Sequence, residues 1–178
     1  MSREDAESFN TLQDDLRGCL SGLEAVEFES LGGPGRGIFV VLRERGLRRR
    51  IELADASFGT VRLLALLTAL HEPNPPPFTA IEEADHGLHP HALDLLVDRL
   101  RAASQHTQLL LTSHAPTFVN RLKSHELVVC DRDPATGASI IPCIRSEEVA
   151  EKIGISGLGP GELWFSGALG GVPSGFLD

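Results

Sequence analysis

The chain has 178 residues, of which 42% are hydrophobic and 23% are charged, a length that suits one domain with a substantial core and is short for two. Its formal net charge of −9 argues against a surface that coats nucleic acid, because such surfaces need clustered Lys and Arg. The cysteines are three in number and lack C-x-x-C spacing, which argues against a disulfide framework or a structural zinc site and favours a reducing cytosol.

The first part of the chain predicts a helix and then a β-hairpin. From Ala6 to Ala25 apolar residues recur every three or four positions, as in an amphipathic helix, and its acidic, polar beginning is unlike a signal peptide. Short strands are expected over Ala25–Ser30 and Gly37–Arg43, and Leu47–Leu53 alternates as a further strand of the hairpin. The basic run Arg48–Arg50 is most simply a solvated strand face, with nucleic-acid contact as the alternative.

After Ser57 the sequence alternates between apolar helices and short apolar strands. The longest apolar run, Leu63–Leu70, is far too short to span a bilayer, so a soluble, cytoplasmic protein without membrane contact is expected. The predicted elements are helices over Val61–Leu70, His91–Ser104 (preceded by Pro90), Pro116–Leu122 and Ser146–Ile153, and strands over Phe78–Ile81, Gln108–Thr112, Leu127–Cys130 and Ser139–Ile144.

This alternation is typical of a mainly parallel sheet flanked by helices in an α/β domain. We expect a single domain over residues 1–178. It would consist of a helix and hairpin region over 1–55, a core that carries the chemistry over 56–145, and a Gly-rich tail over 146–178.

Two adjacent carboxylates, Glu82 and Glu83, follow the apolar strand Phe78–Ile81. Open α/β sheets place their ligands at the C-terminal ends of the strands. One carboxylate at such a place can hold a hydrated Mg²⁺, and the other can orient or deprotonate an attacking water. Two solvated acids at the end of a strand are the alternative, and this segment alone leaves both interpretations open.

A second polar cluster, Thr112-Ser113-His114, follows the next predicted strand, Gln108–Thr112. Because parallel strands end at the same edge of a sheet, His114 is expected at the edge that carries the two carboxylates. A histidine there can hydrogen-bond a phosphoryl oxygen or an attacking water. Taken alone, His114 is equally well explained as a structural histidine.

A third segment, Ser57-Phe58-Gly59-Thr60, leads directly into the helix predicted over Val61–Leu70. Ser57, Gly59 and Thr60 therefore lie at or near a helix N-terminus, where free N–H groups and the helix dipole favour an anion. An ordinary serine cap is the alternative explanation of Ser57.

The order and spacing of these segments are more specific than any one of them. Ser-x-Gly-Thr at a helix start, a strand ending in Glu-Glu, Gly-Leu-His-Pro, and a strand ending in Thr-Ser-His together resemble the ABC-type ATPases. More narrowly, the chain resembles the AAA group of ABC-class ATPases related to RecF-like, SMC-like and OLD-type proteins of DNA repair and phage defence. The likeness extends over residues 51–173, including the closing stretch 162–173.

The resemblance implies a role for the residues of two motifs. Ser57, Gly59 and Thr60 match the signature motif, which in this family contacts the γ-phosphate of ATP held by the opposite subunit. The strand that ends in Glu82 and Glu83 matches the Walker B strand. By this resemblance Glu82 stands at the Mg²⁺ position, and Glu83 is the catalytic carboxylate.

Two further motifs match as well. Gly87–Pro90, which includes His89, matches the D-loop region that crosses the dimer interface, and His114 matches the switch histidine. The sequence departs from the family at two positions. The family usually has an acid where Phe58 stands and a proline where Ala84 stands.

The resemblance has one large gap. No G-x-x-x-x-G-K-[ST] string, whose amides and Lys hold phosphates in a P-loop, occurs in the sequence. Family members carry that motif near their N-terminus, before the matched region. We therefore expect the C-terminal half of an ABC-type ATPase, whose ATP and Mg²⁺ bind only in a site completed by a P-loop-bearing half or subunit, as in a dimer. By itself such a chain would neither bind ATP tightly nor hydrolyse it.

Two alternatives remain open. A non-catalytic module that dimerises or docks on a P-loop-bearing partner would need none of this chemistry. His86, His89 and His91, with Asp85 and Glu83 nearby, form a potential metal cluster that would fit a metal-dependent hydrolase, although the D-loop match explains the same segment without metal. A role on nucleic acid follows from the family likeness alone.

Overall fold

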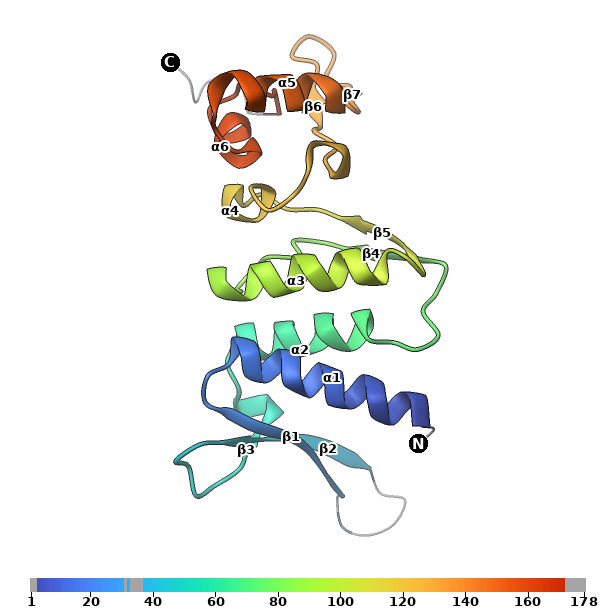
Figure 1. Ribbon diagram of the computed structural model, residues 1–178, viewed down its shortest axis with the longest axis vertical. Coiled ribbons are helices and arrows are strands. Elements are labelled where there is room, and N and C mark those ends of the chain that lie inside the picture. The colour runs from blue at the N-terminus through green and yellow to red at the C-terminus, as the bar shows by residue number, and fades with distance from the viewer. Residues whose placement is uncertain (1–2, 31, 33–36, 172–178) are drawn as a thin grey trace. The chain divides into compact units, whose positions relative to one another are not determined.

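A computed structural model of the chain describes residues 3–30, 32 and 37–171. The chain divides into two compact units, residues 1–112 and 113–178 (Figure 1). Most of the turn expected after the first strand, and residues 172–178 of the expected tail, lie outside the described residues. The expectation of a single domain stays a prediction.

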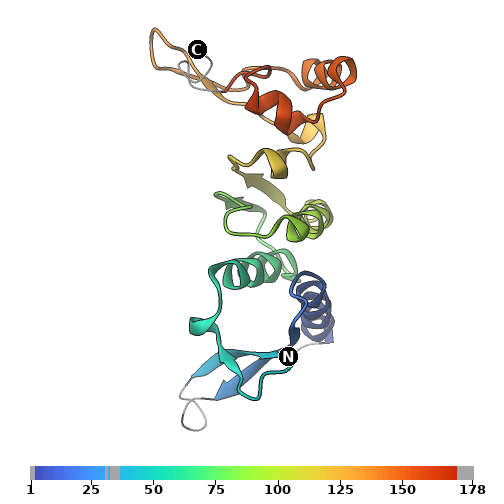
Figure 2. The ribbon, with the colours of Figure 1, turned by 90° about the vertical axis from the view of Figure 1, so that its left-hand side faces the viewer.

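The first unit combines helices with two small sheets. In chain order its elements are α1 (Arg3–Cys19), β1 (Leu23–Ser30), β2 (Ile38–Glu44), β3 (Ile51–Glu52), the 3₁₀ turn η1 (Leu53–Asp55), α2 (Phe58–Leu70), β4 (Phe78–Ile81), α3 (Pro90–Ala103) and β5 (Gln108–Leu111). β1, β2 and β3 form an antiparallel sheet, whereas β4 and β5 pair in parallel. Figures 1 and 2 show α1 and α2 between the antiparallel sheet and α3.

The core of the first unit is made of aliphatic side chains. Apolar residues at helical spacing on α1, α2 and α3 meet the inward-facing residues of β1 and β2, which is how an amphipathic helix and a half-buried sheet both remove apolar surface from water. The buried members of this cluster are Leu12, Leu16, Leu23, Val26, Leu42, Leu63, Leu67 and Ala92.

The predicted α/β class is confirmed, and most predicted elements of residues 56–112 are present. α2 and β4 cover the predicted segments, and β5 ends one residue before the predicted Thr112. α3 begins at Pro90, whose fixed φ suits the first turn of a helix. Within the described residues, parallel pairing is limited to β4 and β5, and the other strand pairs are antiparallel.

Two predicted elements of the first unit were too long. The helix predicted to reach Ala25 ends at Cys19, because a turn at Ser21 and Gly22 reverses the chain and Leu23 and Ala25 are buried as residues of β1. Of the strand predicted over 47–53, only Ile51–Glu52 pairs with β2, and the chain then forms η1.

A buried ionic network ties the three helices of the first unit together. Asp15 of α1, only 6% exposed, accepts two hydrogen bonds from Arg99 of α3, at 2.6 and 2.7 Å. Nε2 of His71, the residue that caps α2, lies 2.7 Å from the same carboxylate. Burial by itself raises the pKa of Asp15, but the hydrogen bonds from Arg99 and His71 outweigh it and hold that pKa below its ordinary value.

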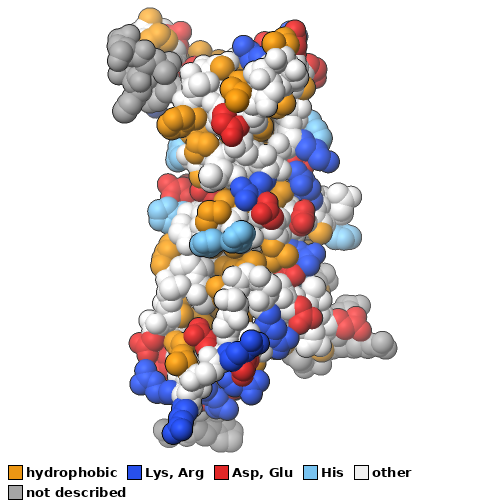
Figure 3. Space-filling view, turned by 60° about the vertical axis from the view of Figure 1, so that its left-hand side comes forward, with side chains coloured by type: hydrophobic (Ala, Val, Ile, Leu, Met, Phe, Trp, Pro, Cys, Tyr) orange, Lys and Arg blue, Asp and Glu red, His pale blue; other side chains and the backbone are white. Residues whose placement is uncertain are grey.

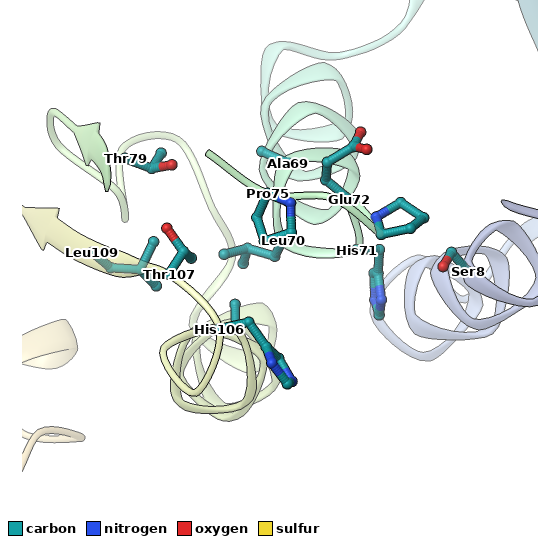
Figure 4. A pocket seen from close by; sticks show the side chains of 12 residues that line it. Ser8, Ala69, Leu70, His71, Glu72, Pro75, Thr79, His106, Thr107 and Leu109 are labelled. Atoms are coloured by element: carbon teal, nitrogen blue, oxygen red, sulfur yellow. The ribbon is translucent and has the colours of Figure 1, made fainter. Parts of the chain in front are cut away.

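A cavity of about 330 Å³ lies beside this network (Figure 4). His71, His106 and Glu72 contribute polar walls, and Leu70 and Leu109 contribute apolar ones. The cavity is on the side of the β4–β5 pair where the strands begin, and so it is separate from the carboxylates that follow the strand ends.

The second unit is smaller and has its own core. Its elements are α4 (Pro116–Val119), the 3₁₀ turn η2 (Ser124–Glu126), β6 (Asp131–Arg132), β7 (Ser139–Ile140), α5 (Ser146–Ser156) and α6 (Pro160–Phe165). Val149, Leu163 and Leu169 form the buried cluster. The backbone N–H of Gly161 donates to Asn120 Oδ1 at 2.6 Å, which joins the end of α4 to α6.

The strands predicted in the second unit are shifted and shortened. The pairing lies at Asp131–Arg132 with Ser139–Ile140 instead of starting at Leu127. Beyond the pair the two arms stay adjacent, since the Cys143 N–H donates to the Val129 carbonyl at 2.8 Å. In the described part of the chain, no helix is long and apolar enough to cross a membrane.

Candidate functional site

The parallel strands β4 and β5 end side by side, and predicted site residues follow these ends. The two strands pair in register, with Ile81 opposite Leu111 at the end. Thr112 continues the pairing, because its N–H donates to the Ile81 carbonyl at 3.0 Å. Glu82 and Glu83 therefore emerge next to Thr112 at one edge of the sheet.

The backbone at Glu83 has an unusual conformation. Its φ of 46° is positive, which no other non-glycine residue in the described part of the chain shares. Such a conformation costs about 1–3 kcal/mol for a residue with a side chain, so the surrounding contacts must hold it. The Glu83 N–H donates to Thr112 Oγ1 at 3.1 Å, and the Glu83 carbonyl accepts from the His86 N–H at 2.9 Å. The Glu83 carboxylate is itself exposed and lies 3.2 Å from Nδ1 of His86.

An arginine from α2 reaches the same turn. Nη2 of Arg62 donates to the carbonyls of Glu82, at 2.5 Å, and Glu83, at 3.1 Å. Nε of Arg62 and Oδ1 of Asp85 are both buried, and neither has a hydrogen-bond partner among the described residues. A guanidinium that donates to two carbonyl oxygens makes a charge-assisted contact.

The predicted signature segment forms the N-terminus of α2. Ser57 is the N-cap, and its Oγ accepts from the Thr60 N–H at 3.1 Å and lies 2.8 Å from Thr60 Oγ1. The first N–H groups of a helix, here those of Phe58 and Gly59, have no acceptor within the helix. The segment is thus a capped helix start, with the donors that an anion could use.

The helix start packs directly on the turn that follows Glu83. A Cβ on Gly59 would lie 2.5 Å from the Gly87 carbonyl oxygen, so only glycine allows this approach of the two backbones. Gly87 has a φ of 73°, and a Cβ there would lie 2.6 Å from the Phe58 ring. The Phe58 ring also meets His86 edge to face, with ring centroids 5.6 Å apart. The segments predicted as signature and D-loop are therefore in contact within one chain.

Replacing Gly59 by alanine is expected to lower the free energy of unfolding by about 1–3 kcal/mol, because the new methyl group collides with a backbone oxygen instead of a movable side chain. Gly154→Ala is the matched control. Gly154 lies in α5 with nothing within 4 Å of its Cβ position, so alanine there should be neutral or slightly stabilising. Urea unfolding followed by circular dichroism measures both. Equal effects of the two substitutions would contradict the Gly59–Gly87 contact.

The histidines proposed as a metal cluster are not brought together. His89 caps α3, where its Nδ1 accepts from the His91 N–H at 3.3 Å, and the two rings stack 5.1 Å apart. His86 instead pairs with Glu83. Among the described residues, no group of three or more His, Cys, Asp or Glu side chains could hold a metal ion. The metal-dependent alternative therefore has no assembled site there.

His114 belongs to the second unit and is not among the residues that the first unit brings together. It is exposed and lies just before α4, after Ser113, whose Oγ accepts from the Ala115 N–H at 3.1 Å. The first unit assembles Ser57, Gly59 and Thr60 with the turn that carries Glu82, Glu83 and the start of the D-loop segment.

The arginine run at the β2–β3 connection takes part mostly in ion pairs. Arg50 pairs with Glu27 and Glu29 of β1, and Arg49 lies 4.0 Å from Asp55. Figure 3 shows the basic side chains at this end of the first unit interspersed with acidic ones. The run is solvent-exposed as expected, but it lies in the connection between β2 and β3 and not on a strand face.

Sequence reasoning overlooked the role of Arg62. It is the one charged residue in the apolar helix FGTVRLLALLTAL, and this isolation is a signal that Arg62 makes a specific polar contact. An arginine in the middle of an apolar helix needs a polar partner, because a buried charge without one is strongly unfavourable.

Comparisons with known proteins agree with this fold. A family model described as "AAA domain, putative AbiEii toxin, Type IV TA system" matches residues 1–120, more than half of the chain. No curated protein sequence matches the chain.

Among solved structures, an SMC ATPase from a study of ATP-driven dimerization and DNA-stimulated activation has a TM-score of 0.54 and 11% identity, over 86% of this chain and 96% of that one. A Pyrococcus furiosus Smc head domain with an extended coiled coil, bound to the C-terminal domain of ScpA, has a TM-score of 0.61 and 14% identity, over 85% of this chain and 38% of that one. A Pyrococcus yayanosii Smc head domain has a TM-score of 0.59 and 15% identity, over 85% and 29%.

The fold is that of an SMC-like ATPase head, and at these low identities the likeness to solved structures is one of fold. The chain spans less than half of the two Pyrococcus chains. With the family model matched over residues 1–120, the chain belongs to this family of AAA domains. The expected relationship to ABC-class and SMC-like AAA ATPases is confirmed.

Proposed function

We propose that this chain contributes the signature segment Ser57–Thr60 and the Walker B carboxylates Glu82 and Glu83 to ATP-hydrolysing sites that P-loop-bearing segments or subunits complete. Ser57 faces the nucleotide of one site, and Glu83 serves the other. The observation that carries the proposal is the contact of the Ser57–Gly59 helix start with the Glu83–Gly87 turn. The two segments with the strongest likeness to nucleotide motifs thus lie together at one sheet edge, while the sequence lacks a G-x-x-x-x-G-K-[ST] string.

The groups present suit Mg²⁺ and phosphate. Glu82 and Glu83 offer exposed carboxylate oxygens, which Mg²⁺ prefers, and Glu82 would hold the ion. The capped N-terminus of α2, with the Ser57 and Thr60 hydroxyls and the Gly59 N–H, suits a terminal phosphate. Bound Mg²⁺ would supply charge that neutralises the phosphate oxygens.

The remaining roles follow from the same assignment. Glu83 would orient and deprotonate the attacking water as a general base, a role that needs an accessible carboxylate in a fixed position. His114 would hydrogen-bond the transferring phosphoryl group or that water. His89, in the D-loop segment, would lie at the interface with the partner that carries the P-loop.

An uncovered face of the β4–β5 pair supports docking of a P-loop-bearing partner. Phe78, Ala80 and Leu110 lie on one face of the two strands, and Phe78 and Leu110 are 49% and 56% exposed. Parallel sheets are normally covered on both faces. The face adjoins the strand ends that carry Glu82 and Thr112, so a P-loop-bearing segment seated there would bring its phosphate-binding loop to the carboxylates.

Co-purification from native cells, with and without Mg-ATP, tests the proposal. We expect a partner, or a longer form of the same polypeptide, that contains a G-x-x-x-x-G-K-[ST] sequence. Leu110→Asp should reduce its recovery, whereas Val128→Asp, at an exposed apolar residue of the second unit, should not. Partners that all lack the P-loop sequence would contradict the proposal.

The same face also favours a second candidate function, a non-catalytic docking module. Such a module would keep its partner when Glu83 is replaced by glutamine, and ATP turnover of the assembly would not change. A place in a phage-defence or DNA-repair system is part of the proposal, and the family description itself names a type IV toxin–antitoxin system. The SMC ATPase whose study concerns ATP-driven dimerization supports a dimer.

A further inference from the structure

Arg62 joins α2 to the turn of the predicted catalytic carboxylate. Its Nη2 donates to the carbonyl oxygens of both Glu82 and Glu83, at 2.5 and 3.1 Å. The two residues lie 20 and 21 positions further along the chain, so the contact is tertiary and not part of a local cap. Nε of Arg62 is buried while the residue as a whole is half-buried, so one edge of the guanidinium lies against the protein.

The turn has few other anchors. The Glu83 N–H donates to Thr112 Oγ1 at 3.1 Å, and the Ala84 N–H donates to the Thr112 carbonyl at 3.1 Å. Ala84 is fully buried. Thr112 and Arg62 therefore hold the left-handed conformation of Glu83 from its two sides.

The start of α2 contacts the same turn a second time. Gly59 approaches the Gly87 carbonyl as closely as a glycine can, and the Phe58 ring packs against Gly87 and His86. Arg62 follows Phe58 by about one turn of the helix. Residues from two successive turns of α2 thus contact the segment from Glu82 to Gly87. A shift of the start of α2 would therefore displace this segment.

We propose that Arg62 is a positioning residue that makes the orientation of Glu83 depend on the position of the signature segment. The proposal rests on the proposed function. In the arrangement of the proposed function, the Ser57 segment contacts the nucleotide of one site, while Glu83 of the same chain acts on the nucleotide of the other site. Arg62 would then couple the two sites through one rigid piece of one chain, so that Glu83 is held ready for hydrolysis when Ser57 is engaged.

Amide hydrogen exchange in the 178-residue chain, followed by NMR, tests the positioning role without any ATPase activity. Arg62→Gln should speed exchange of the Glu83 and Ala84 amides about tenfold, as expected for loss of a hydrogen bond from a charged group. Exchange at Val97 in α3 should stay unchanged, which rules out global destabilisation. Arg62→Lys, a milder change that keeps one donor, should give an intermediate increase. Arg48→Gln, at an exposed arginine of the β2–β3 connection, is the matched control and should change neither amide.

Unchanged exchange of Glu83 and Ala84 in both Arg62 variants would overturn the proposal. In the completed assembly, Arg62→Gln should also reduce the Hill coefficient for Mg-ATP from above one to about one, a change that simple loss of folded protein cannot produce. An unaltered coefficient, or a wild-type value of one, would overturn the coupling while leaving the proposed function intact. Turnover that is insensitive to Glu83→Gln would instead overturn the proposed function, and the exchange result would still decide whether Arg62 positions Glu83.

Discussion

Replacing Asp15 by alanine is expected to lower the free energy of unfolding by about 3 kcal/mol, the low end of the range for breaking a buried ion pair. The substitution leaves Arg99 and His71 without the carboxylate that both contact. The low end applies because the Arg99 side chain is one-third exposed and can recover some hydration. The three residues belong to, or cap, α1, α2 and α3, so the loss loosens the packing that holds the helices together.

The adjacent acid offers a matched control for this prediction. Asp14 is exposed and pairs with Arg17 one turn away on the same helix, an interaction worth only about 0.3–0.5 kcal/mol. Urea unfolding of Asp14→Ala should therefore resemble that of the wild type. Equal losses in the two variants would show that the buried network does not contribute the expected stability.

The Asp15 network also predicts how stability changes with pH. The pKa of Asp15 is lower in the folded chain than its ordinary value of about 3.9, so the ionised carboxylate stabilises the fold above that pH. The contribution is lost as the pH falls through the lowered pKa. Between about pH 5 and pH 2 the wild type should lose more stability than Asp15→Ala, and the two unfolding curves should converge. A difference that grows on acidification would contradict this sign.

Replacing Glu83 by glutamine is expected to lower ATP turnover of the completed assembly about a hundredfold or more, the usual contribution of a general base. Glutamine keeps the size of the side chain but cannot accept a proton from water. The Thr112 and Arg62 contacts are made by the Glu83 backbone, so the turn should survive the substitution.

Glu52→Gln, at an exposed glutamate of β3 away from the turn, is the control for this prediction. Its turnover should equal that of the wild type. A phosphate-release assay on the co-purified assembly measures both variants. Equal turnover in Glu83→Gln and the wild type would mean that Glu83 is not the catalytic carboxylate.

The sequence predicted best those elements that local signals delimit. α2 ends before prolines, α3 begins at Pro90, and β4 and β5 are short apolar strands between polar turns. It predicted worst the strand over 47–53, of which only Ile51–Glu52 pairs, and the strand over 127–130, a short apolar run that precedes the pairing at Asp131–Arg132. Whether such a segment forms a strand depends on a neighbouring backbone that local pattern does not reveal.

In the candidate site, too, features with local sequence signals were predicted and features that depend on distant partners were not. The order of the motifs predicted which residues belong to the candidate site. The parallel pairing of β4 and β5 explains why Glu82 and Thr112 lie side by side. The positive φ of Glu83, the Arg62 contact and the Gly59–Gly87 approach could not be predicted, because each depends on partners about 20 or more residues away along the chain. The Asp15 network joins residues 56 and 84 positions apart and left no local signal.

A calorimetric titration with Mg-ATP tests the central claim most directly, because ATP affinity in these ATPases comes mainly from the P-loop. The 178 residues alone should show no binding in the micromolar range, and binding should emerge when a P-loop-bearing partner is added. Micromolar binding of Mg-ATP by these residues alone would contradict the claim that they form one side of a site completed from elsewhere.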